Sequence, residues 1–261
     1  MHRSMLIFVF AVVLAACATS PLGRKQLVFF PDDQLDQMGV AAYAQAKQET
    51  PPSTDAVENR YVTCVAKAVT AVAEKGPKEW EVTVFNKDDV NAFALPGGKI
   101  GVYTGLLKVA KNQDQLATVI SHEVAHVLAR HGNERVSTAY ATQTGLELVQ
   151  AMAGGASQDK SNLMALLGLG AQVGVILPFS RTQESEADLL GLDLMAKAGF
   201  DPRASVDLWK NMIAASGNGG PAFLSTHPAS SQRIKDLENR MPKAMPVYEQ
   251  ARAQGKVPNC Q

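Results

Sequence analysis

The chain carries the stretch Ser121-His122-Glu123-Val124-Ala125-His126 inside an apolar run, Gln115 to Arg130, that contains neither glycine nor proline. Apolar residues recur there at helical spacing, which predicts a helix. On a helix of about 3.6 residues per turn, His122 and His126 lie on one face, one turn apart. Two imidazoles in that relation can bind the same ion, and this spacing on a helix is typical of zinc sites.

Glu123 directly follows the first histidine and would flank the open coordination position of such a site. A carboxylate there can accept a proton from metal-bound water, so Glu123 is the predicted general base. The alternative is a chance match on a core helix whose histidines hydrogen-bond to the backbone. A third ligand elsewhere in the sequence is needed to decide between the two.

The third ligand is not of the metzincin kind. That class requires a glycine and a histidine at fixed positions after the second histidine, where this chain has Ala129 and Gly132. A gluzincin site instead requires a glutamate on a later helix, followed one turn on by an acidic residue that orients a histidine. Glu184 and Asp188 meet this requirement, because residues four apart share a helix face.

Composition leaves the partner open, and nothing in it argues for nucleic acid. The 261 residues are enough for one catalytic domain, and 25 basic residues balance 25 acidic ones. Aromatic residues make up only 6% of the chain. A nucleic-acid-binding protein would carry a basic excess, so we expect no nucleic-acid partner.

The N-terminus is predicted to be a processing segment. Arg3 precedes a short apolar run, and Leu14-Ala15-Ala16-Cys17 at its end resembles a bacterial lipobox. Residues 1–16 would then be a lipoprotein signal peptide, Cys17 the lipidated residue, and residues 17–25 a lipidated tether. Ala18 resembles the pattern for delivery to the outer membrane, facing the periplasm of a Gram-negative bacterium. The alternative is a plain secretory signal cut elsewhere.

Two further cysteines remain in a chain that is expected to be exported. Because the periplasm and the cell exterior oxidise thiols, a disulfide between Cys64 and Cys260 is one hypothesis. One buried thiol and one thiol on the tail is the other, since sequence alone does not give their separation.

The order of the elements predicts a mainly helical α+β fold with a small three-stranded sheet beside the zinc-binding helix. Alternating apolar residues predict strands at Trp80 to Phe85, Val90 to Leu95 and Lys99 to Tyr103. Residues 26–241 would form the metallopeptidase domain, with an irregular, proline-containing tail at 242–261. The apolar segment 162–179 is predicted to be a buried or membrane-touching helix rather than a spanning one.

In gluzincin-like proteases a sheet edge beside the zinc holds substrate as an added strand, because main-chain hydrogen bonds bind an extended peptide with little regard to its side chains. The likeness to that class implies the same here. The candidate edge is Asn91, Ala92, Phe93 and Ala94. An ordinary hairpin strand is the alternative. Arg130 and His131 are expected on the solvent side at the end of the histidine helix, where cations suit the helix dipole.

Three motifs occur in order: His122-Glu-Val-Ala-His126, Glu184-Ser-Glu-Ala-Asp188, and Thr226-His227-Pro228 with Arg233. Together they resemble the HtpX-type zinc metalloprotease family, which includes periplasmic lipoproteins of the YggG (LoiP) and BepA kind. The resemblance covers about residues 22 to 240. It implies a gluzincin-like metalloprotease domain with one zinc ion per chain.

The resemblance also implies residue roles. Zinc would be held by His122, His126 and Glu184, the first glutamate of its motif. Glu186 could compete, but a separation of two residues points it to another side of the helix. Asp188 would hydrogen-bond to His122 and fix its ring.

His227 and Arg233 belong to the third motif. His227 would either stabilise the oxyanion of the intermediate or fill the open zinc position in a resting state. Arg233 would hold a substrate carbonyl. The alternative is a loop histidine and a surface arginine on the last helix.

The expected activity is zinc-dependent hydrolysis of peptide bonds in unfolded or misassembled envelope proteins, a quality-control role that the resemblance suggests. The expected partners are these unfolded proteins, the membrane through the lipid anchor, and the outer-membrane protein assembly machinery. A lipid-anchored periplasmic chaperone or assembly factor, with a mostly latent protease site, is the alternative.

Overall fold

The structure is a computed structural model that describes residues 17–152, 179–215, 222–228 and 230–260. Its central element is helix α4, Gln113–Leu128, which is buried from Gln115 to His126. The side chain of Asn112 caps the helix by accepting a hydrogen bond from the Gln115 amide. The helix therefore forms where its apolar periodicity predicts, and it runs through the core with its histidines enclosed.

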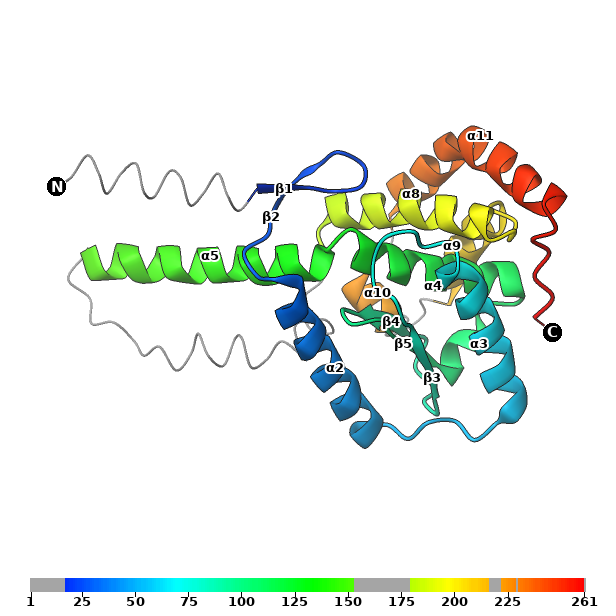
Figure 1. Cartoon of the computed structure of the whole chain (residues 1–261), viewed down its shortest axis with the longest axis horizontal. Helices are drawn as coiled ribbons and strands as arrows, with labels where there is room; N and C mark the ends of the chain where they lie inside the picture. Colours follow the sequence, from blue (N-terminus) through cyan, green and yellow to red (C-terminus); the bar gives the residue numbers. More distant parts are fainter. Residues whose placement is uncertain (1–16, 153–178, 216–221, 229, 261) are drawn as a thin grey trace.

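Helix α8, Arg181–Lys197, packs against α4 and brings the second motif to the first (Figure 1). Ser180 and Gln183 form a capping box at its start. A Cβ at Gly191 would lie only 3.0 Å from the His122 amide nitrogen, so this position requires glycine for the two backbones to approach so closely. This close crossing is what places Glu184 and Asp188 beside the histidines.

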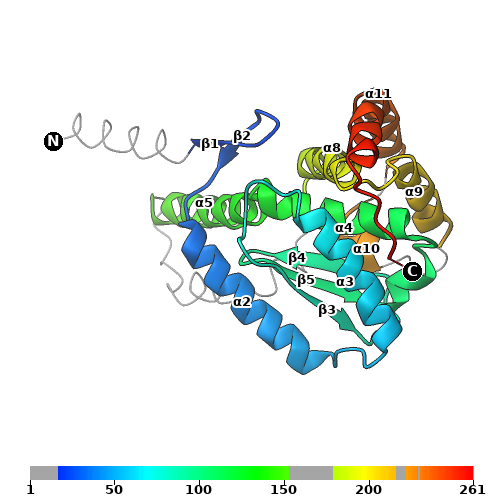
Figure 2. The ribbon, with the colours of Figure 1, turned by 45° about the vertical axis from the view of Figure 1, so that its right-hand side comes forward.

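The sheet lies on the other side of α4 and has the predicted strands (Figure 2). Strands β3 (Glu81–Phe85), β4 (Ala92–Leu95) and β5 (Lys99–Tyr103) are ordered β3-β5-β4. Strand β5 pairs in parallel with β3 and antiparallel with β4. Strand β4 is therefore an edge strand, and it is the strand that contacts α4.

Further helices pack around α4 and the sheet. They are α2 (Asp32–Glu49), α3 (Ala56–Thr70), the 3-10 helix η1 (Thr104–Lys108), α5 (His131–Met152), α9 (Ala204–Ala214) and α10 (Ala222–Thr226). Helix α2 among them forms a smaller apolar cluster with the sheet. Apolar side chains of α3, the sheet, α4, α8 and α9 form one continuous core. The predicted mainly helical α+β fold is confirmed.

Two predicted segments lie outside the described residues: the signal peptide at 1–16, and the apolar helix at 162–179 except for Phe179. Among the helices that the structure does describe, none combines the length and the apolar character that crossing a bilayer requires.

The prediction of an irregular tail at 242–261 is wrong for residues 242–253, which belong to helix α11, Ser231–Ala253. Pro242 and Pro246 lie inside it, four residues apart and both exposed. Each proline removes one backbone hydrogen bond, but the freed carbonyls lie on the solvent side, where water can bind them. Burial of Leu237, Ala244 and Ala251 on the opposite face stabilises the helix.

Cys64 on α3 and Cys260 after α11 form a disulfide, with Cα atoms 5.5 Å apart. The bond ties the end of the chain to an early helix, as the first of the two hypotheses states. It closes a loop with a sequence separation of 196 residues.

Removing this bond should destabilise the fold. We expect the variant Cys64→Ser/Cys260→Ser to lose about 4 kcal/mol of unfolding free energy. Without a bond that closes so long a loop, the unfolded chain has a higher conformational entropy. Urea unfolding of the variant and of the wild type, each with and without reductant, measures the loss. Reductant should bring the wild type to the variant's midpoint. Equal midpoints without reductant would contradict the prediction.

Candidate metal centre

Four buried side chains from three parts of the chain converge beside α4. His122 and His126 come from α4, Glu184 from α8, and His227 follows α10. One nitrogen or oxygen atom of each lies within 4.8 Å of those of the others. The structure thus brings together the three predicted zinc ligands and adds His227 as a fourth candidate.

The spacing of these atoms fits a tetrahedral zinc site. Ligand atoms about 2.0–2.2 Å from one zinc ion lie roughly 3.3 Å from each other. Nε2 of His122 lies 3.1 Å from Nε2 of His126. Oxygens of Glu184 lie 3.5 Å from each of these nitrogens. Nδ1 of His227 is 3.2 Å from His122 Nε2 and 2.9 Å from Glu184. The donor set and its dimensions both fit Zn²⁺.

Charges within the cluster shift the pKa values of its members. Burial alone would raise the pKa of Glu184, but hydrogen bonds to His122, His126 and His227 hold it well below its usual range. Burial tends to lower the pKa of His122, yet the contacts with Asp188 and Glu184 raise it to about 9. Burial lowers the pKa of His126 well below its usual value. These shifts favour an ionised Glu184 and a neutral His126, the forms in which a carboxylate and an imidazole bind a metal.

Glu123 lies beside the cluster without joining it. Its Oε2 accepts a hydrogen bond from the Ala94 amide of β4 at 3.3 Å, and its Oε1 lies 3.3 Å from Nε2 of His227. Burial raises the pKa of the Glu123 carboxyl, although His227 and His122 oppose the shift. A carboxylate with a raised pKa beside the ligands suits a proton acceptor.

Asp188 and Arg233 contact the candidate ligands and hold them in place. Oδ1 of Asp188 lies 3.0 Å from Nδ1 of His122, in the predicted relation. Arg233 donates two hydrogen bonds to Asp188, at 2.6 and 2.7 Å, and its Nη1 lies 2.6 Å from Glu184. Its side chain is 5% exposed. Arg233 is thus neither a surface residue nor placed to hold a substrate carbonyl. It fixes two carboxylates.

His131 was expected on the solvent side, but it is fully buried. Its Nδ1 lies 2.9 Å from Nδ1 of His126, and its Nε2 lies 3.1 Å from Glu186. The turn before it explains the error: Arg130 adopts a left-handed conformation with φ 57°, so α5 starts in a new direction. Arg130 itself is partly exposed and pairs with Asp32, as expected of a solvent-side cation.

The segment expected to be a tether is bound to the domain. Strand β1, Cys17–Thr19, pairs with β2, Lys25–Leu27, and the loop between them reaches Glu186. Ser20 donates a hydrogen bond to Glu186, and Arg24 Nε donates another at 2.8 Å. Glu186 therefore does not compete for the metal. It links the N-terminal segment through His131 to the ligand His126.

Arg24 also pairs with Glu134, with nitrogen–oxygen distances of 2.5 and 2.7 Å. We expect this ion pair to make the stability of the fold depend on pH. Burial tends to raise the pKa of Glu134, but contacts with Arg24 and Gln183 lower it overall. A carboxyl whose pKa is lower in the folded state contributes stability above its unfolded value of 4.5 and loses it as the pH falls toward its folded value.

Glu134→Gln should therefore destabilise the metal-free protein by about 1 kcal/mol near pH 6, and the difference should shrink below about pH 4. Urea unfolding in chelator at both pH values measures it. Asp88→Asn, which alters an exposed ion pair, is the control and should change little at either pH. A difference that grows in acid would contradict the prediction.

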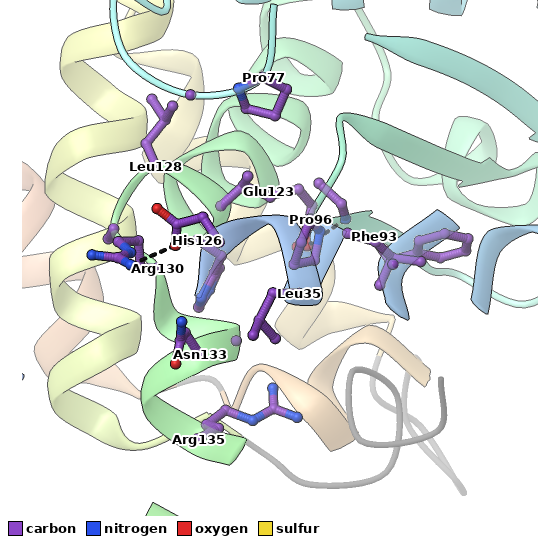
Figure 3. Close-up of a pocket in the computed structure, with 18 of the residues that line it drawn as sticks. Leu35, Pro77, Phe93, Pro96, Glu123, His126, Leu128, Arg130, Asn133 and Arg135 are labelled. Carbon is purple, nitrogen blue, oxygen red and sulfur yellow. Dashed lines mark hydrogen bonds and ion pairs between the residues drawn. The ribbon is translucent and has the colours of Figure 1, made fainter. Parts of the chain in front are cut away.

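A cleft of about 740 Å³ opens beside the cluster (Figure 3). It is lined by Glu123, His126 and His227, by the predicted edge residues Asn91, Ala92, Phe93 and Ala94, and by residues of α2 and the N-terminal hairpin. Strand β4 thus borders the cleft, with its Ala94 amide already bound to Glu123. The arrangement allows an extended chain to lie along β4 next to the cluster.

The sequence of the same region matches a known family. Residues 56–241, which include all four cluster residues and Glu123, match the profile of Peptidase family M48. The chain belongs to peptidase family M48. The His-His-Glu-His cluster is consistent with the zinc site of an M48 peptidase.

Several named proteins are similar to this M48 chain. The mitochondrial metalloendopeptidase OMA1 of Schizosaccharomyces pombe is 42% identical over 186 residues, covering 70% of this chain and 53% of the relative. OMA1 of Saccharomyces cerevisiae is 39% identical over 181 residues, covering 66% and 50%. The beta-barrel assembly-enhancing protease of Escherichia coli is 28% identical over 225 residues, covering 82% and 45%. The chain spans about half the length of these curated relatives.

Proposed function

We propose that the protein is a zinc-dependent metalloendopeptidase. The observation that carries the proposal is the convergence of His122, His126 and Glu184 at zinc-site spacing, with Glu123 alongside and open to the cleft. Membership of family M48 and the similarity to two kinds of named endopeptidase or protease support the same reaction.

A zinc ion held by His122, His126 and Glu184 would polarise a peptide carbonyl and make a water molecule more acidic. Glu123 would be the proton acceptor for a water molecule at the cluster, since its Oε1 has no hydrogen-bond partner among the described residues and faces the cluster. It would then pass the proton to the leaving amine. Asp188 and His131 hold the outer nitrogens of the two histidines, so both rings keep Nε2 turned inward.

His227 favours a second candidate function. Its Nδ1 occupies the fourth corner of the ligand set, where water or substrate has to enter. We infer a resting state in which His227 closes the site. Phe223 stacks on its ring with centroids 4.4 Å apart, which supports this position. A lipid-anchored chaperone or assembly factor with a mostly latent protease site is therefore the alternative.

We further propose an exported, lipid-anchored protein that acts on unfolded or misassembled envelope proteins. The lipobox at Cys17 supports the anchor. The printed name of the Escherichia coli relative supports a connection to outer-membrane protein assembly. The same relative supports the expected resemblance to BepA-like proteases, and the resemblance to YggG (LoiP) lipoproteins of the periplasm is part of the proposal.

Cleavage of denatured casein tests the proposed activity. Purified protein with one equivalent of zinc should cut casein, chelator should stop the cleavage, and added zinc should restore it. Suppression of casein aggregation without any cleavage would support the chaperone alternative. A rate unchanged by chelator would contradict a zinc peptidase.

A further inference from the structure

Arg135 lies on α5, one turn beyond His131, and is only 8% exposed. None of its three guanidinium nitrogens has a hydrogen-bond partner among the described residues. A buried charge without partners is costly, and fully buried arginines in folded proteins are normally paired. Within the part of the chain that the structure describes, Arg135 is thus a buried cation whose guanidinium N–H groups are unpaired.

The neighbours of Arg135 fix its position and leave its donors free. Its guanidinium carbon lies 4.0 Å from the ring centre of Phe179. Stacking on an aromatic ring holds the plane of a guanidinium but uses none of its N–H groups, which point outward in that plane. Arg135 lines the cleft that Glu123 and His126 also line (Figure 3). Phe179 lines the same cleft. The cation therefore forms part of the cleft wall.

The ring of Phe179 sets an upper limit on the distance between Arg135 and the metal cluster. Its ring centre is 3.8 Å from that of His126 and 4.0 Å from the Arg135 guanidinium carbon. The guanidinium carbon and the His126 ring are consequently no more than about 8 Å apart, the length of about two residues of extended chain. A peptide cut at the cluster would bring a group within two or three residues of the cut to Arg135.

Charge favours a carboxylate as that group. Burial lowers the pKa of Arg135 to about 10, against the opposing effect of Glu184 and Glu123, so the side chain is a cation at neutral pH. Arg130 also lines the cleft, but it is partly exposed and already paired with Asp32. A neutral carbonyl would satisfy one donor and leave the charge uncompensated, whereas a carboxylate accepts two hydrogen bonds from the planar fork and neutralises it.

We propose that Arg135 is a specificity-determining residue that binds a carboxylate of the substrate about two residues from the scissile bond. The carboxylate is either an acidic side chain or the free C-terminus of the peptide. This inference rests on the proposed peptidase function, and its tests separate the two claims.

Cleavage mapping is the first test. Denatured casein is digested by wild type, Arg135→Met, Arg135→Lys and the control Arg130→Gln, each loaded with zinc, and the cut sites are identified by mass spectrometry. Wild type and Arg130→Gln should show about tenfold enrichment of Asp, Glu or the chain end at one position within three residues of the cut. Arg135→Met should lose the enrichment, and Arg135→Lys should retain part of it. Unchanged enrichment in Arg135→Met would overturn the inference.

Binding of small carboxylates is the second test and needs no cleavage. In the Glu123→Gln background, the melting temperature is measured with N-acetylalanine, which offers a terminal carboxylate, and with the α-amide of N-acetylglutamate, which offers a side-chain carboxylate. At least one should raise the melting temperature with Arg135 present and not with Arg135→Met, and the one that does identifies the source. Equal responses with and without Arg135 would overturn the inference.

The two tests fail differently. An Arg135-dependent rise in melting temperature, together with no casein cleavage by the zinc-loaded wild type, would support the carboxylate site and contradict the peptidase function. Arg135→Met without ligand should melt no lower than wild type, because it removes an unpaired buried charge. A lower melting temperature combined with unchanged carboxylate binding would show that Arg135 is merely structural and would overturn the inference.

Discussion

Glu123→Gln should lower kcat/KM for peptide hydrolysis by at least about 10³-fold while the protein still binds one zinc ion. The amide keeps the shape of the side chain and can still meet the Ala94 amide and His227, the two contacts that the carboxylate makes. It cannot accept a proton at neutral pH. Because Glu123 is outside the ligand cluster, metal content should not change.

The measurement is casein or quenched-peptide hydrolysis together with metal analysis of the same preparation. Glu238→Gln, the same change at an exposed position of α11, is the matched control and should retain full activity. Wild-type turnover by Glu123→Gln would remove this residue as the base. Loss of zinc along with activity would instead make it a ligand.

Glu184→Gln should lower zinc affinity by at least about 10²-fold and abolish activity, because it removes the negative charge that offsets the cation. Nη1 of Arg233 lies 2.6 Å from Glu184, so the variant also removes part of the negative charge that neutralises this buried arginine. Isothermal titration with zinc, or competition with a chromogenic chelator, measures the affinity.

Glu186→Gln is the matched control for this variant, since it makes the same change two residues away on the same helix. Glu186 contacts Ser20, Arg24 and His131 rather than the metal cluster. The control should still bind one equivalent of zinc, with a smaller loss of affinity transmitted through His131 and His126. If the Glu186 variant lost the metal and the Glu184 variant kept it, the assignment of the third ligand would be reversed.

The parts of the site that the sequence predicts are those set by local helical geometry. His122 and His126 are four residues apart on one helix, and so are Glu184 and Asp188, so each pair was placed correctly before any tertiary contact was known. Alternation likewise predicts a strand before α4, but its place at the edge of the sheet depends on which strands β5 pairs with. The Cys64–Cys260 bond was one of two open alternatives, because its closure depends on α11 reaching back to α3.

The parts that could not be predicted depend on a change of backbone direction or on long-range charge pairing. His131 was misplaced because the left-handed Arg130 interrupts the helical periodicity that would have located it. Arg233 was expected to face substrate because sequence does not show that its donors meet two buried carboxylates and two backbone carbonyls. The sequence predicts a short lipidated tether at 17–25 but does not show its contacts with Glu186, which span more than 160 residues.

The position of the metal is the most direct test of this account. Crystals of the purified protein, measured at the zinc absorption edge, should show one anomalous peak about 2.0–2.2 Å from Nε2 of His122, Nε2 of His126 and a carboxylate oxygen of Glu184. A strong peak bound to other residues, or zinc-supplemented crystals of active protein with no peak at this cluster, would contradict the account.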